Sequence, residues 1–73
     1  MARIIWERRE HEDHIFWVAR SGRYSLRIDA NKPGVYRWTI QDVTDHNRYV
    51  AGDLAPDRAA ADQAVRAALA GLA

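Results

Sequence analysis

Apolar and polar positions alternate along five short stretches of the chain, before its character changes near residue 56. These stretches are rich in aromatic and β-branched residues, and clusters of turn-forming residues separate them. Alternation with a period of two is typical of β-strands that bury one face. The pattern therefore predicts a four- to five-stranded antiparallel meander with strands over residues 3–9, 14–20, 23–29, 35–43 and 48–51.

The lengths of the predicted turns set which residues face each other across the sheet. With a two-residue turn at Ser21-Gly22 and a four-residue turn at 10–13, the opposed residues are apolar or aromatic, as they must be if they share a buried face. These pairs are Trp17 with Leu26, Ile15 with Ile28, Ala19 with Tyr24, Trp6 with Trp17, and Ile4 with Ala19. Alternating residues of the fourth strand, Tyr36, Trp38 and Ile40, extend the same face.

The loop at 30–34 leaves two registers open. A five-residue loop places Arg27 opposite Arg37, which is unfavourable unless an anion lies between the two guanidinium groups. A loop of Lys32-Pro33-Gly34 places Arg37 opposite Asp29 as an ion pair instead.

From Pro56 onward the chain is rich in alanine, which favours a helix over residues 56–70 that ends at Gly71. Small and apolar residues form one stripe along it, namely Ala61, Val65, Ala68, Leu69 and Leu72. This stripe would pack closely on the bulky side chains of the sheet. We therefore expect a single α+β domain over residues 1–73, with the helix packed on one face of the sheet.

The sheet face that the helix does not cover is where we expect function. In the predicted register Phe16 faces Arg27 there and His14 faces Asp29. Arginine and aromatic residues are enriched at protein interfaces. The leading hypothesis is a non-enzymatic regulatory module that binds itself, as a homodimer of stacked sheets, or another protein. The predicted contact residues are Ile5, Phe16, Val18, Arg27, Arg37 and Thr39.

Two other interpretations of this face remain. It could be an ordinary solvated face on which arginine stems lie over apolar side chains. Alternatively, it could bind single-stranded nucleic acid through Arg9, Arg20, Arg27 and Arg37. Eleven basic and ten acidic residues nearly cancel, so bulk charge does not attract nucleic acid, and the predicted burial of most aromatics favours a protein partner.

The sequence points to no catalytic residue, metal, cofactor or small-molecule substrate. It has no cysteine, and its glycines are scattered singly without forming a phosphate-binding loop. His11 and His14 lie near carboxylates, but no second ligand cluster completes a metal site, so we expect a solvated hairpin loop. Ser21 and Ser25 lack the context of a nucleophile. We expect no enzyme activity.

The apolar stretches are too short and too interrupted to span a membrane. Charged residues follow Ile4 and Ile5 at once, which leaves no apolar region for a signal peptide. We therefore expect a cytoplasmic protein that does not bind membranes.

At Gly22-Arg23-Tyr24, Tyr36-Arg37-Trp38 and Ala51-Gly52, followed by the predicted helix over 60–69, the chain resembles short, largely uncharacterised phage and actinobacterial proteins built from β-hairpins and one helix. The likeness spans most of the chain. Because it concerns fold residues only, it implies no active or binding residue. It implies the role of an accessory regulator, a host-modifying phage protein or a nucleic-acid-binding module.

Overall fold

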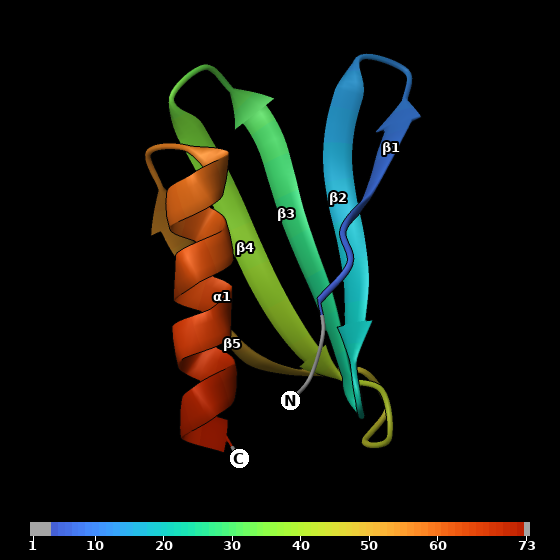
Figure 1. The fold of residues 1–73 in the computed structure, drawn as a ribbon. Coiled ribbons are helices and arrows are strands. Elements are labelled where there is room, and N and C mark those ends of the chain that lie inside the picture. The colour runs from blue at the N-terminus through green and yellow to red at the C-terminus, as the bar shows by residue number, and fades with distance from the viewer. Residues whose placement is uncertain (1–3, 73) are drawn as a thin grey trace.

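A computed structural model describes residues 4–72, except for the side chain of Asn31. Within this part, five strands form one antiparallel sheet in the order β1-β2-β3-β4-β5, followed by a helix (Figure 1). The elements are β1 (Glu7–His11), β2 (His14–Ser21), β3 (Tyr24–Lys32), β4 (Val35–Asp42), β5 (Arg48–Ala55) and α1 (Arg58–Leu72). The predicted α+β fold, a meander sheet with one C-terminal helix, is confirmed.

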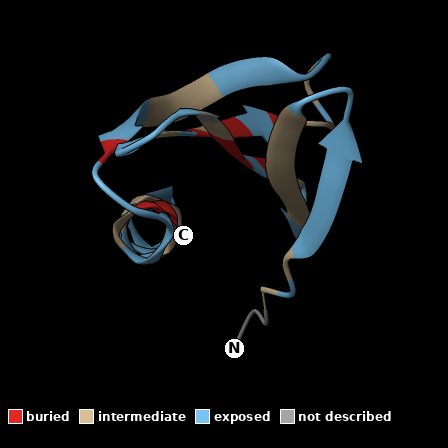
Figure 2. Ribbon diagram, turned by 90° about the horizontal axis from the view of Figure 1, so that it is seen from above, coloured by how far each residue is buried: buried red, intermediate tan, exposed pale blue. Residues whose placement is uncertain are grey.

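The core lies between α1 and the middle of the sheet. Leu26, Ile28 and Ile40 are fully buried in β3 and β4, and they form one cluster with Ala61 and Val65 of the helix. Figure 2 shows these buried positions gathering where α1 faces the sheet. Burying one large aliphatic side chain contributes about 1.5–3 kcal/mol, so this cluster is the main source of stability.

Large aromatic side chains close the core beside the helix, which packs on β3, β4 and β5. Trp6 and Trp17 are half-buried against the core cluster. The Trp6 indole Nε1 donates a hydrogen bond of 2.7 Å to Asp62 of α1. The Trp17 ring lies 6.2 Å from that of Tyr36, and the Arg58 guanidinium lies 5.4 Å from the Trp17 ring centroid. The Trp6 bond ties the segment before β1 to the helix, and the Arg58 contact ties β2 to it.

The predicted register of the second hairpin is wrong by two residues. The turn is Gly22-Arg23, so Trp17 pairs with Ile28 and Ala19 with Leu26. Ser21 pairs with Tyr24 and belongs to the strands. The turn types most favoured in two-residue hairpins have a positive φ at their first central residue, and Gly22 adopts one of 59°.

The first hairpin also has a two-residue turn, at Glu12-Asp13, and it shifts the register in the same sense. Trp17 pairs with Arg8, so the predicted pair of Trp6 and Trp17 is wrong. Glu12 supplies the positive φ, at 57°. A shift of two residues leaves every side chain on its predicted face, because side chains alternate with a period of two.

In the third hairpin, the pairing predicted for the shorter loop is found, but the loop itself is one residue shorter than predicted. Asp29 pairs with Arg37 and Arg27 with Thr39, with an irregularity between Asp29 and Lys32. Lys32 pairs with Val35, which leaves Pro33-Gly34 as the turn, with Gly34 at φ 74°. Proline followed by a positive-φ glycine is typical of a type II turn.

Several element boundaries differ from the predicted ones. Strand β1 begins at Glu7 and extends to His11, and residue 3 of the predicted strand lies outside the described residues. Strand β5 continues to Ala55, four residues beyond its predicted end. The helix begins two residues later than predicted because Asp57 caps it, with Oδ1 accepting a 2.7 Å hydrogen bond from the Ala60 amide. The helix also passes through Gly71 to Leu72.

The turn between β4 and β5 is held by the buried carboxylate of Asp42. Its Oδ2 accepts a 2.6 Å hydrogen bond from Arg23, and its Oδ1 accepts bonds from the Thr44 hydroxyl at 2.7 Å and the Thr44 amide at 3.0 Å. The bond from Arg23, followed by those from Thr44, lowers the pKa of Asp42 from its ordinary value of 3.8 to about 2.

None of the helices in residues 4–72 has the length and apolar character needed to cross a membrane.

Replacing Ile40 tests the core. Ile40→Ala leaves a cavity at a fully buried position, so the free energy of unfolding should fall by about 2–5 kcal/mol. The control Ile5→Ala removes the same atoms from a side chain that is 70% exposed, and it should change stability by less than about 0.5 kcal/mol. Urea unfolding followed by circular dichroism measures both. Equal effects would show that the core is misassigned.

The lowered pKa of Asp42 predicts how stability depends on pH. A carboxylate with a depressed pKa in the folded state stabilises fully above its unfolded value, and this contribution is lost as the pH falls from 3.8 toward about 2. The Asp42→Asn variant should be less stable than the parent at neutral pH, and the difference should narrow through this acid range. Urea unfolding between about pH 6 and about pH 2 measures it. A difference that stays constant with pH would contradict the assignment.

Candidate functional site

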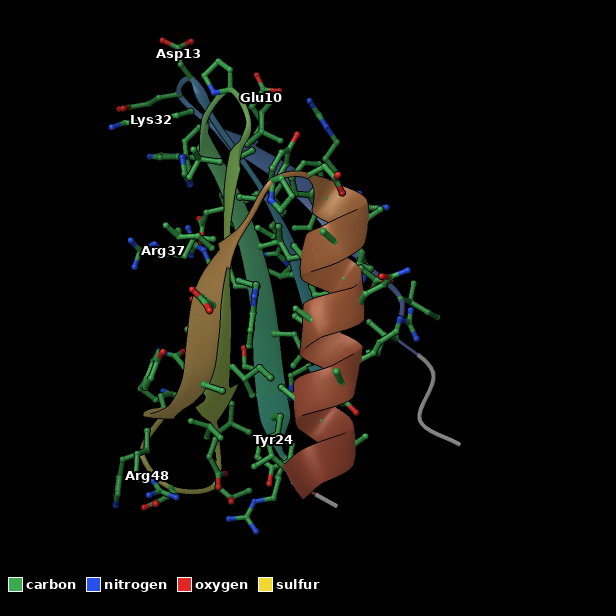
Figure 3. All side chains as sticks on the ribbon, turned by 90° about the vertical axis from the view of Figure 1, so that its left-hand side faces the viewer. Glu10, Asp13, Tyr24, Lys32, Arg37 and Arg48 are labelled. Carbon is green, nitrogen blue, oxygen red and sulfur yellow. The ribbon has the colours of Figure 1, made fainter. Side chains whose placement is uncertain are left out.

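The candidate site is the sheet face opposite α1, called here the uncovered face. None of the described elements packs on it, whereas α1 lies against the other side (Figure 2). Two rows of paired residues cross its centre, Val18-Arg27-Thr39 and Phe16-Asp29-Arg37. Figure 3 shows Arg37 and Lys32 projecting from the side away from the helix. The predicted contact residues of β2, β3 and β4 therefore share this face, and Ile5 adjoins it beside Val18.

A carboxylate lies at the centre of the uncovered face. Asp29 is buried, and its two oxygens accept hydrogen bonds of 2.8 Å and 3.1 Å from Arg27 Nε. The Nε2 atom of His14 lies 2.8 Å from Asp29 Oδ1. Burying a charge is costly unless it is paired and hydrogen-bonded, and these partners meet that requirement.

The aromatic ring of Phe16 is covered by the same group of side chains. The Arg27 guanidinium carbon lies 4.2 Å from the Phe16 ring centroid, within the range of a cation–π contact. His14 stacks on Phe16 with a centroid distance of 5.5 Å. The predicted contacts of Phe16 with Arg27 and of His14 with Asp29 are thus present. They run diagonally, because Phe16 pairs directly with Asp29 and Val18 with Arg27.

Three of the four arginines considered for nucleic-acid binding are already engaged. Arg9 forms a 3.3 Å ion pair with Glu7, Arg20 donates a 3.2 Å hydrogen bond to the Gly22 carbonyl, and Arg27 holds Asp29. Such groups would have to exchange these partners for phosphates.

Arg37 differs from these three. It pairs with Asp29 in the register, but the predicted ion pair between them is wrong: no carboxylate within residues 4–72 forms an ion pair with Arg37. The reason is that Arg27 and His14 already hold the Asp29 oxygens. Arg37 is left as an exposed cation.

The structure adds apolar residues to the uncovered face that the sequence reasoning missed. Leu54 is 55% exposed and pairs with Arg37, and Tyr49 is 61% exposed and pairs with Gln41. They line a hollow above Gly52, where an added Cβ would lie 2.8 Å from the Trp38 carbonyl oxygen and 2.9 Å from the Tyr49 hydroxyl. These residues were missed because the fifth strand was predicted to end at residue 51. The absence of proline between residues 52 and 55 would have allowed a longer strand that ends at Pro56.

The charged loop at His11–His14 holds the two histidines that the sequence places near carboxylates. Among the described residues, no three His, Asp or Glu side chains gather closely enough to hold a metal ion. His14 lies against Asp29 and Phe16 on the uncovered face instead.

Fold and surface together define a small α+β domain whose antiparallel five-stranded sheet is packed by a helix on one face and presents a mixed apolar and charged surface on the other. Comparisons of the chain with protein families, with curated proteins and with solved structures find no match. The resemblance to phage and actinobacterial proteins stays a prediction.

The central carboxylate can be tested by substitution. Asp29→Ala removes a buried carboxylate that is hydrogen-bonded to both Arg27 and His14, so the free energy of unfolding should fall by about 1–3 kcal/mol. In the control, Glu7→Ala removes the partner of Arg9 from an exposed pair, which should cost less than about 1 kcal/mol. Chemical denaturation of the two variants side by side measures both values. An Asp29→Ala variant as stable as the parent would rule out an organising role for this carboxylate.

Proposed function

We propose that this domain is a non-enzymatic interaction module that binds a protein partner, most simply a second copy of itself, through the uncovered face. The observation that carries this proposal is the exposure of large apolar side chains around a centre of internally paired charges. Leu54 and Tyr49 on this face and Ile5 at its border are each more than half exposed.

The paired centre suits an interface. Removing a lone charge from water is costly, whereas Arg27 and Asp29 would enter an interface already hydrogen-bonded to each other. Arg27 and Phe16 also belong to the residue types that are enriched at protein interfaces. Stacking of such a sheet face on another surface would resemble the packing of two sheets in a β-sandwich.

The same contacts argue against single-stranded nucleic acid as the primary ligand. Proteins that bind single strands offer aromatic faces for base stacking and cations for phosphates. Here Phe16 is covered by Arg27 and His14, which leaves Tyr49 as the exposed aromatic ring on the described part of this face. A protein partner can pack on these side chains without breaking their present contacts.

Site-specific photocrosslinking tests the proposal. A photoreactive residue at Gln41, exposed on the uncovered face, should yield protein adducts in cells that express the full chain. The matched control replaces Gln63, exposed on α1, with the same photoreactive residue and should yield few. Denaturing gels and mass spectrometry identify the adducts. Absence of adducts at Gln41, or the same adducts at both positions, would refute the proposed use of this face.

A further inference from the structure

Arg20, which bonds the Gly22 carbonyl, has no carboxylate partner on the uncovered face, and within the described residues two further cations on this face also lack one. These two are Lys32 and Arg37, and both line a shallow hollow with the exposed aliphatic side chains of Val35 and Leu54. Asp29 lies in the same hollow, but its oxygens are held by Arg27 and His14. We call Lys32 and Arg37 the cationic corner.

Two acidic residues are in the complementary situation. Glu12 and Asp13 form the exposed turn between β1 and β2, and neither forms an ion pair with a cation in residues 4–72. The neighbouring acids Glu7 and Glu10, by contrast, each have an arginine partner. We call Glu12 and Asp13 the acidic tip.

The acidic tip and the cationic corner lie at the same end of the sheet but on different hairpins. Figure 1 shows the turns β1–β2 and β3–β4 at one end, and Figure 3 places Asp13 and Lys32 there. Strand β2 and part of β3 separate the two groups within one molecule. Their charges can therefore be matched directly in a second molecule.

We propose that the partner is a second copy of this chain, stacked on the uncovered face, with the acidic tip of each copy seated on the cationic corner of the other. This inference rests on the proposed function and names its partner. A two-fold axis parallel to the strands, passing over β3, produces this arrangement. It lays β1 and β2 of one copy over β4 and β5 of the other and keeps the strands aligned. Because the interface is isologous, each charged contact occurs twice.

The same symmetry matches the remaining groups of the face. Phe16 of one copy approaches Arg37 of the other, because the two residues lie in one row on either side of Asp29. The two copies of Arg27 meet near the axis, where each is neutralised by its own Asp29. Exposed Leu54 comes to lie beneath β1 of the second copy.

The area of the broad face falls at the lower end of the range for specific protein interfaces, about 600–1,000 Å² on each partner. The protein measures 32 × 22 × 20 Å along its principal axes, so its broad face offers roughly 700 Å². A standard protein interface buries about 800 Å² on each partner.

Reversing the charges of each group in a separate variant, and then mixing the two variants, tests this arrangement. The first variant, Glu12→Lys with Asp13→Lys, and the second, Lys32→Glu with Arg37→Glu, each place like charges together in their own homodimers. Each should raise the dimer dissociation constant by about tenfold or more. An equimolar mixture restores both contacts in the heterodimer, so its dissociation constant should return close to the parent value. Sedimentation velocity up to about 1 mM measures all three, and the parent dimer should weaken with added salt.

Two further variants control for poor folding and for a general effect of net charge. Glu12→Gln with Asp13→Asn removes the tip charges without reversing them, and should weaken the dimer even if the lysine variant folds poorly. Gln63→Glu changes the net charge on α1, away from the interface, and should leave the dimer unchanged. Circular dichroism and thermal melting confirm that each variant is folded.

The outcomes separate this inference from the proposed function. A parent protein that stays monomeric at about 1 mM overturns the second copy as partner, while adducts at Gln41 with a different protein would still support the interaction module. A dimer that tolerates both reversals overturns the assigned contacts. A monomer that binds a labelled single-stranded oligonucleotide, and loses this binding with Lys32→Glu and Arg37→Glu, assigns the cationic corner to nucleic acid instead.

Discussion

The packing of α1 against β3 and β4 determines everything else in this molecule. Leu26, Ile28 and Ile40 are buried beneath Ala61 and Val65, and because side chains alternate along a strand, their burial forces the intervening residues to the opposite face. The alanines of the helix let it lie close to the sheet, and the bulk comes from the strands. The uncovered face is therefore a direct consequence of the core.

The sequence predicted correctly which face of the sheet each side chain lies on, because the hydrophobic alternation is strong. The two errors in turn position each moved the register by an even number of residues, which does not change the face. In both N-terminal hairpins the true turn moves the register by two residues, so Trp17 changes its neighbour but not its face. An error of one residue would have placed Phe16 under the helix. Glycine signalled a turn at Gly22 correctly, but it did not show that Gly22 must be the first central residue. That choice depends on its positive φ.

What could not be predicted depends on choices made in three dimensions. Asp29 lies opposite Arg37 in the ladder, yet it bonds Arg27, two positions along its own strand, together with His14. The distance between strands alone does not determine which of several neighbouring cations a carboxylate will bind. The continuation of strand β5 to Ala55 was missed because it runs through Gly52 and Asp53, residue types that are depleted in strands. The irregularity opposite Ile40 and Gln41, inside the predicted strand, places Tyr49 on the uncovered face. A bulge of this kind leaves a weak signal in one sequence.

The distribution of charge matters more here than its sum. The chain is nearly neutral, and most of its acidic and basic groups near the sheet are paired locally, as Arg27 is with Asp29 and Arg23 with Asp42. A nucleic-acid binder of this size would be expected to leave a continuous band of cations unpaired. This sheet instead leaves a small positive group and a small negative group at one end, on different hairpins, with apolar side chains between and beside them. Opposite charges separated on one rigid surface gain most from a partner with the reverse arrangement, and a two-fold related copy has that arrangement by construction.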